Sequence, residues 1–167
     1  MDILDRIIIR KATIADLDAV TALEAECFPA AEAASRDSFA WRLEAYPQHF
    51  IVVELDGRII SFVNGPVTVE ADLVDEMYSD ASYCNDSGEW QMIFGIATRT
   101  DLQCRGIASY LMRIFIEEAR SQGRKGVVLT CKEHKINFYS SFVYIDEGVC
   151  GSMHGGVPWH QMRIIFE

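Results

Sequence analysis

The stretch Gln103-Cys104-Arg105-Gly106-Ile107-Ala108 decides how this sequence folds. It follows an apolar run over residues 92–97 and opens an amphipathic segment, so the predicted order is strand, tight loop, helix. A loop that leads into a helix N-terminus directs unpaired backbone N–H groups toward one point, where the helix dipole also favours an anion. Gly106 permits close approach of the backbone, and Arg105 adds a charge that pairs with phosphate oxygens. The stretch therefore predicts a phosphate-binding loop.

This loop has neither the Gly-Lys-Ser/Thr ending of a P-loop nor the triple glycine of a dinucleotide-binding turn. It resembles the pyrophosphate-binding motif of the GNAT superfamily of acyl-coenzyme A-dependent N-acyltransferases, with Gln103, Gly106 and Ala108 at the matching positions. A plain strand-to-helix connection is the alternative for so short a stretch. The rest of the chain decides between the two.

Composition narrows the function classes. The chain has 167 residues, 50% of them hydrophobic and 24% charged, which suits one globular domain over residues 1–167. Its formal net charge of −10 argues against non-specific nucleic-acid binding. Five cysteines without a Cys-x-x-Cys pair predict reduced thiols and no metal site. An acidic start and the lack of an apolar run of roughly 20 residues lead us to expect a cytoplasmic protein without membrane contact.

Apolar patterns and turn residues predict the element order. Strands are expected at 7–10, 50–55, 59–63, 90–98, 127–131, near 144–145 and at 161–166. Thr13 is a predicted helix N-cap, and a second helix should start near Ser35 and stop before Pro47. A third helix should run from the loop to Gln122, and a short helix should hold Tyr139. An Asp-Gly turn at residues 56–57 predicts a hairpin. Residues 66–89 carry seven acidic residues and no Lys or Arg, and they predict a long acidic loop.

This order resembles an α/β GNAT fold along almost the whole chain. The resemblance implies a mixed central sheet of about seven strands, flanked by about four helices, with a splayed parallel pair of strands that holds coenzyme A. In detail the sequence is most similar to the arylalkylamine N-acetyltransferase branch. The similarity lies in residues 23–29, in the hairpin over residues 55–62, and in Cys131 followed by Phe138-Tyr139.

The resemblance also implies a coenzyme site. The pantetheine arm would pair with backbone at Ile96 and Thr98, around Ala97, and Gly95 lies where the strand could bulge or could simply pack under a helix. A backbone N–H on this strand would stabilise the oxyanion, which is typically worth about 3 kcal/mol. The pyrophosphate would bind the loop, made of Gln103, Cys104, Arg105, Gly106, Ile107, Ala108 and Ser109.

Tyr139 occupies the position of the family's general-acid tyrosine, which protonates the departing thiolate; the alternative is a core tyrosine. The resemblance does not extend to the general base. Animal arylalkylamine enzymes carry two histidines on the strand before the loop, where this chain has Met92 and Phe94, and neither side chain can take a proton. The remaining candidates are solvent through a water chain and three side chains, namely Glu89, Gln91 and His154.

The family's acceptor pocket corresponds to Phe28 and Pro29 in the first loop and to His154 and Trp159 before the last strand, with Val157 beside them. The aromatic rings would stack on a ring or face a cation, or they close the core. The acidic stretch is either a mouth that concentrates cationic amines or a solvated loop.

We expect an enzyme that transfers an acetyl group from acetyl-coenzyme A to the primary amine of a small molecule, without a metal, as a monomer or homodimer. Two alternatives stay open: acetylation of a protein N-terminus or lysine, and a coenzyme-binding domain without turnover that acts as a sensor or partner module.

Overall fold

The computed structural model describes residues 2–142, 144–152 and 154–167. They form two compact units, one made of residues 1–65 and 95–115 and the other of residues 66–94 and 116–167. Each unit is assembled from two separate segments of the chain, so neither is a contiguous piece of sequence. A single domain over residues 1–167 stays our proposal.

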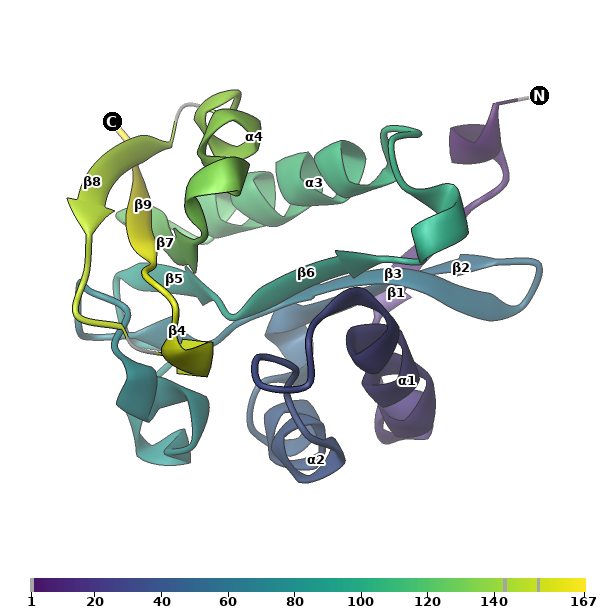
Figure 1. Ribbon diagram of the computed structural model, residues 1–167, viewed down its shortest axis with the longest axis horizontal. Helices are drawn as coiled ribbons and strands as arrows, with labels where there is room; N and C mark the ends of the chain where they lie inside the picture. The colour runs from purple at the N-terminus through teal and green to yellow at the C-terminus, as the bar shows by residue number, and fades with distance from the viewer. Residues whose placement is uncertain (1, 143, 153) are drawn as a thin grey trace. The chain divides into compact units, whose positions relative to one another are not determined.

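The first unit is built on an antiparallel sheet. Its strand order is β1-β2-β3-β6, with β1 at Ile8–Lys11, β2 at Phe50–Leu55, β3 at Arg58–Asn64 and β6 at Gly95–Thr98. Helices α1 (Leu17–Cys27) and α2 (Arg36–Ala45) pack together on one face of this sheet (Figure 1). The core between them contains Phe39, Phe50 and Phe62, whose ring centroids are 5.6 to 6.1 Å apart. Burial of these rings joins the helices to the sheet.

The helices of this unit begin where the sequence predicts. Thr13 and Asp16 form a capping box around a short turn, η2 (Ile14–Asp16), that runs into α1. The Ser35 hydroxyl accepts the N–H of Ser38 at 3.1 Å and caps α2. The predicted Asp-Gly turn is also confirmed, because Asp56 and Gly57 both have positive φ angles of 51° and 79° between β2 and β3.

The second unit is built on a mixed sheet. Its strand order is β4-β5-β7-β9-β8, with β4 at Val67–Thr68, β5 at Trp90–Ile93, β7 at Gly126–Cys131, β8 at Ile145–Val149 and β9 at His160–Ile165. Only the pair β5 and β7 is parallel among the described residues. The short helix α4 (Ile136–Ser140) packs against β8 and β9, and α3 (Ile107–Ser121) contributes its C-terminal residues to this unit.

Short 3₁₀ turns link these elements. In the described part of the chain the remaining ones are η1 (Ile3–Asp5), η3 (Pro47–His49), η4 (Asp75–Tyr78), η5 (Ala81–Tyr83), η6 (Thr100–Leu102), η7 (Glu133–Lys135) and η8 (His154–Gly156). None of the described helices is both long and apolar enough to cross a membrane.

The predicted α/β architecture, with mixed strand directions and four α-helices, is confirmed within the described residues. Two details differ from the expected single sheet of about seven strands. The strand expected at 90–98 is interrupted at Phe94, so that β5 pairs with β7 in one sheet and β6 pairs with β3 in the other. The two-residue strand β4 is an addition, since the predicted acidic loop is partly ordered.

The acidic stretch 66–89, which is part of the second unit, packs against the sheet of that unit instead of extending into solvent. Leu73 and Met77 are buried against Trp90, Met92 and Val128. This apolar burial explains why a segment without an obvious sequence period is ordered.

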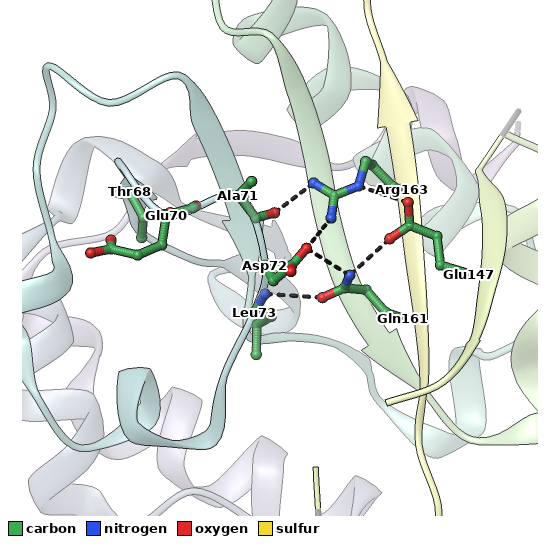
Figure 2. A network of polar contacts seen from close by, with 8 residues as sticks. All are labelled: Thr68, Glu70, Ala71, Asp72, Leu73, Glu147, Gln161 and Arg163. Carbon is green, nitrogen blue, oxygen red and sulfur yellow. Dashed lines mark hydrogen bonds and ion pairs between the residues drawn. The ribbon is translucent and has the colours of Figure 1, made fainter. Parts of the chain in front are cut away.

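A polar network also holds the stretch to the sheet (Figure 2). Arg163 of β9, only 7% exposed, pairs with Asp72 and donates to the carbonyl of Ala71, and it pairs with Glu147 of β8 at 2.9 Å. Gln161 of β9 accepts the N–H of Leu73 at 3.0 Å. A buried guanidinium therefore neutralises part of the acidic charge of this stretch.

Candidate active site

The loop between β6 and α3 has the backbone geometry of an anion cradle. Cys104 and Gly106 both have positive φ angles, 62° and 86°, and a Cβ on Gly106 would meet no atom within 4 Å. Helix α3 begins at Ile107, directly after these residues, so the first N–H groups of the helix have no acceptor within it. Several donors at one helix N-terminus thus remain available to a ligand.

Two side chains complete this loop. Gln103 lies on its exposed surface and donates from Nε2 to the carbonyl of Thr98 at 3.1 Å, which ties the loop to the end of β6. Arg105 is exposed beside Gly106. Its guanidinium is therefore accessible to solvent and can form charge-assisted hydrogen bonds with a phosphate group.

Strand β6 is the edge strand of its sheet in the described structure. Arg99 donates its N–H to the carbonyl of Ile60 at 2.8 Å, and alternate residues of a strand direct their polar groups the same way. The backbone groups of Ala97 therefore face β3, while those of Ile96 and Thr98 face the open edge. The Thr98 carbonyl is already engaged, because it accepts from Gln103 and from Cys27 Sγ at 3.2 Å.

Strand β5, which precedes β6 in the chain, ends early in the second unit. The parallel ladder between β5 and β7 stops at the pair Ile93 and Leu129, whereas β7 continues to Cys131 along its pairing with β9. Gly95 itself has room, because a Cβ there would lie 3.9 Å from its nearest neighbours. Packing under a helix thus does not require glycine at this position.

Tyr139 lies on α4 in the second unit and is half-buried. Its ring contacts Phe138 and Tyr144 at centroid distances of 5.1 and 6.0 Å. Burial, with a smaller contribution from Cys131, raises the pKa of its phenol well above the usual value of 10. Among the described residues the Tyr139 hydroxyl makes no hydrogen bond, so this neutral phenol can donate to a ligand.

His154 and Trp159 lie together in the second unit. The indole N–H of Trp159 donates to the His154 carbonyl at 2.7 Å, and the two rings are 6.0 Å apart. Tyr78, which the sequence analysis did not select, stacks on the His154 ring at 5.4 Å and packs against Phe94 at 4.7 Å. In the sequence, the spacing of Leu73, Met77 and Tyr78 could have indicated an ordered apolar face in this stretch. The acidic residues around them made the stretch look like a polar loop.

Phe28 and Pro29 belong to the first unit, just after α1. Phe28 is half-buried and donates its N–H to the Glu24 carbonyl at 3.0 Å, and Pro29 is exposed. The structure thus groups the predicted acceptor residues as two pairs, one in each unit.

The candidate bases have different surroundings. Met92 is fully buried in the apolar core and Phe94 packs on Tyr78, so both positions are structural. Gln91 is buried and donates to the carbonyls of Pro66 and Met92, while Glu89 is exposed. No group of three or more His, Cys, Asp or Glu that could hold a metal occurs among residues 2–142, 144–152 and 154–167.

The family model described as Acetyltransferase (GNAT) family matches residues 17–142. No curated protein sequence matches this chain significantly.

Solved structures match over nearly the whole chain. The GphF GNAT-like decarboxylase in complex with isobutyryl-CoA is 20% identical, with 95% of this chain and 98% of that chain covered and a TM-score of 0.82. The loading GNATL domain of CurA from Lyngbya majuscula is 14% identical, with 95% and 97% covered and a TM-score of 0.83. The putative acetyltransferase yncA from Salmonella typhimurium, solved with acetyl-CoA, is 17% identical, with 97% and 95% covered and a TM-score of 0.68. At these identities the structural matches establish the fold.

Proposed function

This chain belongs to the Acetyltransferase (GNAT) family, and we propose that it transfers an acetyl group from acetyl-coenzyme A to the primary amine of a small molecule. The observation that carries the proposal is the cradle at residues 103–109, where positive φ angles at Cys104 and Gly106 lead into the N-terminus of α3 beside the exposed Arg105. A plain connection between strand and helix also has unpaired N–H groups, but it does not require positive φ angles at Cys104 and Gly106.

The cradle suits a pyrophosphate in charge and in geometry. Backbone N–H groups and the helix dipole favour the anion, and Arg105 adds a positive charge at the surface where a ligand arrives. We assign the pyrophosphate of acetyl-coenzyme A to residues 103–109. The structure of yncA with acetyl-CoA is consistent with a coenzyme on this fold.

The open edge of β6 suits the pantetheine arm. Amide groups of an extended ligand pair with strand backbone in the same way as a peptide that adds to a sheet. The outward backbone groups of Ile96 and the outward N–H of Thr98 are the proposed partners. The backbone groups of Ala97 face β3, so we assign this residue the role of holding β6 in the sheet beside the arm.

We assign the general acid to Tyr139. As the amine attacks the thioester carbon, the C–S bond breaks and the thiolate needs a proton. A phenol is protonated at neutral pH and can donate to a thiolate within hydrogen-bond reach. Its hydroxyl makes no hydrogen bond among the described residues, which supports this role over a packing role.

We propose that the acceptor has an aromatic or apolar body. The rings of Tyr78, His154 and Trp159 form one cluster in the second unit, and Phe28 offers a further half-buried ring in the first. Aromatic faces stack on a ring and attract an ammonium group. An arylalkylamine meets both conditions.

The test is thiol release from acetyl-coenzyme A with a panel of acceptors: phenethylamine, tryptamine, spermidine, glycine and short peptides with free N-termini. We expect the first two to give the highest kcat/KM. A preference for the peptides would replace the small molecule by a protein acceptor. Coenzyme binding without turnover of any acceptor would leave only the sensor function.

A further inference from the structure

Two buried polar side chains of the first unit converge on the first residue of β6. Glu24 of α1 is 7% exposed, and Asn64, the last residue of β3, is fully buried. A Cβ on Gly95 would lie 3.9 Å from Asn64 Nδ2 and 3.9 Å from Glu24 Oε1. The carboxylate and the amide therefore flank the same small space above Gly95, which the missing side chain leaves open.

Both side chains are held from behind. Glu24 Oε2 accepts the N–H of Ala34 at 2.9 Å, and Asn64 Oδ1 accepts the hydroxyl of Tyr46 at 2.8 Å. These contacts direct Oε1 of Glu24 and Nδ2 of Asn64 toward Gly95. The side chains are thus oriented before any ligand arrives, as a functional group must be.

The amide of Asn64 has no acceptor for Nδ2 in the described part of the chain. A buried donor without an acceptor costs on the order of 1–3 kcal/mol, and such groups in folded proteins usually meet water or a ligand. An acceptor for Nδ2 that is also a donor to a carboxylate has the hydrogen-bonding pattern of a water molecule.

The inference rests on the proposed function, which puts the reacting groups next to this space. If the pyrophosphate lies at residues 103–109 and the arm follows β6 from Thr98 back toward Gly95, the acyl group lies at the Gly95 end of the strand. The attacking amine must reach that same end. A proton acceptor is needed there, because an alkylammonium with a pKa of about 10.4 is almost fully protonated at pH 7.

We propose that Glu24 is the general base of the reaction and acts through a water molecule that Asn64 positions above Gly95. The ammonium nitrogen gives a proton to this water, and the water gives one of its own to Oε1 of Glu24. The neutral amine then forms the C–N bond as the C–S bond breaks, and Tyr139 gives its proton to the thiolate. The new amide nitrogen loses its extra proton, which returns through solvent to the Tyr139 phenolate, and the carboxylic acid of Glu24 later returns its proton to solvent. Asn64 is a positioning residue in this scheme.

The experiment compares two acceptors of the same shape and different basicity. Phenethylamine needs a base, whereas O-benzylhydroxylamine replaces one CH₂ by oxygen and carries a nitrogen that is neutral at pH 7. Glu24→Gln keeps a carbonyl oxygen for the Ala34 N–H, so the fold should persist. For the variant we expect kcat/KM with phenethylamine to fall about 100-fold or more, the range of general-base catalysis, and kcat/KM with O-benzylhydroxylamine to change only a few-fold.

Glu44→Gln, the same change at an exposed site of α2, should leave both values as in the wild type. Thermal unfolding and acetyl-coenzyme A affinity of Glu24→Gln should match the wild type, and Asn64→Ser should reproduce the acceptor-dependent loss more weakly. Equal losses with both acceptors would overturn the proposal, because a structural role does not depend on acceptor basicity. A wild type that uses phenethylamine but not its neutral isostere would also overturn it.

If the wild type prefers peptides, the same comparison is made between a peptide and its N-terminal aminooxy analogue, with the same expected outcome. A wild type that uses no acceptor contradicts the proposed function, and the role of Glu24 falls with it. A wild type that turns over amines, with a variant that does not discriminate between them, contradicts only the role of Glu24.

Discussion

The side-chain amide of Gln103 donates to the backbone carbonyl of Thr98 at 3.1 Å. This bond closes the cradle loop on the last residue of β6, and the thiol of Cys27 donates to the same carbonyl from α1 at 3.2 Å. The position of the loop relative to the strand edge is therefore set by side chains as well as by the short connection. An intact loop of this kind is what a ligand extending over strand and helix requires.

Gln103→Leu should weaken acetyl-coenzyme A binding about fivefold. The substitution removes one hydrogen bond, worth about 1 kcal/mol, and loosens the loop against β6. Calorimetric titration measures the change, and Gln122→Leu at an exposed position after α3 is the matched control. Equal affinities of the Gln103 variant and the wild type would show that the loop keeps its position without this bond.

Arg105→Glu should weaken acetyl-coenzyme A binding about tenfold or more. A charge-assisted bond to phosphate, worth about 1.5–3 kcal/mol, is replaced by repulsion at the exposed rim of the loop. Arg113→Glu, an exposed site further along α3, carries the same charge change and should have little effect. A similar loss in both variants would indicate long-range electrostatics instead of a contact in the cradle.

Tyr139→Phe should lower kcat and kcat/KM together, by about 100-fold, and leave acetyl-coenzyme A affinity near the wild-type value. The proton is needed only as the thiolate departs, so the loss concerns the transition state. Steady-state kinetics and calorimetry separate the two quantities, and Tyr83→Phe controls for removal of a hydroxyl. Wild-type turnover in the Tyr139 variant would leave protonation of the thiolate to solvent.

Trp159→Ala should change the ranking of acceptors, with tryptamine and phenethylamine losing most, because a ring of the proposed acceptor cluster is removed. The cost to the best aromatic acceptor should be about 1–2 kcal/mol in kcat/KM. An unchanged ranking would remove Trp159 from the acceptor site.

Raising the ionic strength should raise KM for cationic amines, since salt screens the acidic residues of stretch 66–89 beyond about 8 Å. A neutral acceptor such as O-benzylhydroxylamine controls for general effects of salt.

Asp16→Asn should destabilise the fold at neutral pH by about 1–3 kcal/mol. Arg10 donates to both carboxylate oxygens of Asp16 at 2.8 Å, and this pairing is the main cause that lowers the pKa of the carboxyl in the folded state. A lowered folded pKa stabilises the fold above the unfolded value of about 3.9, and that stabilisation is lost as the pH falls below it. Chemical denaturation at pH 7 and below pH 4 should therefore show a gap between wild type and variant that narrows on acidification. A constant gap would mean that ionisation of Asp16 is not involved.

Local chemistry in the sequence was enough for several features. Thr13, Ser35 and the Asp56-Gly57 turn predicted helix starts and a hairpin that the structure confirms, since caps and turns depend on residues close in the chain. The strand-loop-helix order around Gly106 was predicted for the same reason, and the family match over residues 17–142 is consistent with it.

Other features were decided by tertiary structure. The interruption at Phe94, which assigns β5 and β6 to different sheets, depends on partners far away in the sequence, namely β7 and β3. The order of the acidic stretch depends on Arg163 and on apolar neighbours that no local pattern indicates. Glu24 and Asn64 are 40 residues apart and meet at Gly95 only because α1 packs on the sheet that contains β3 and β6. Periodicity and capping act within a few residues, whereas burial and the pairing of charges act between residues that only the folded chain brings together.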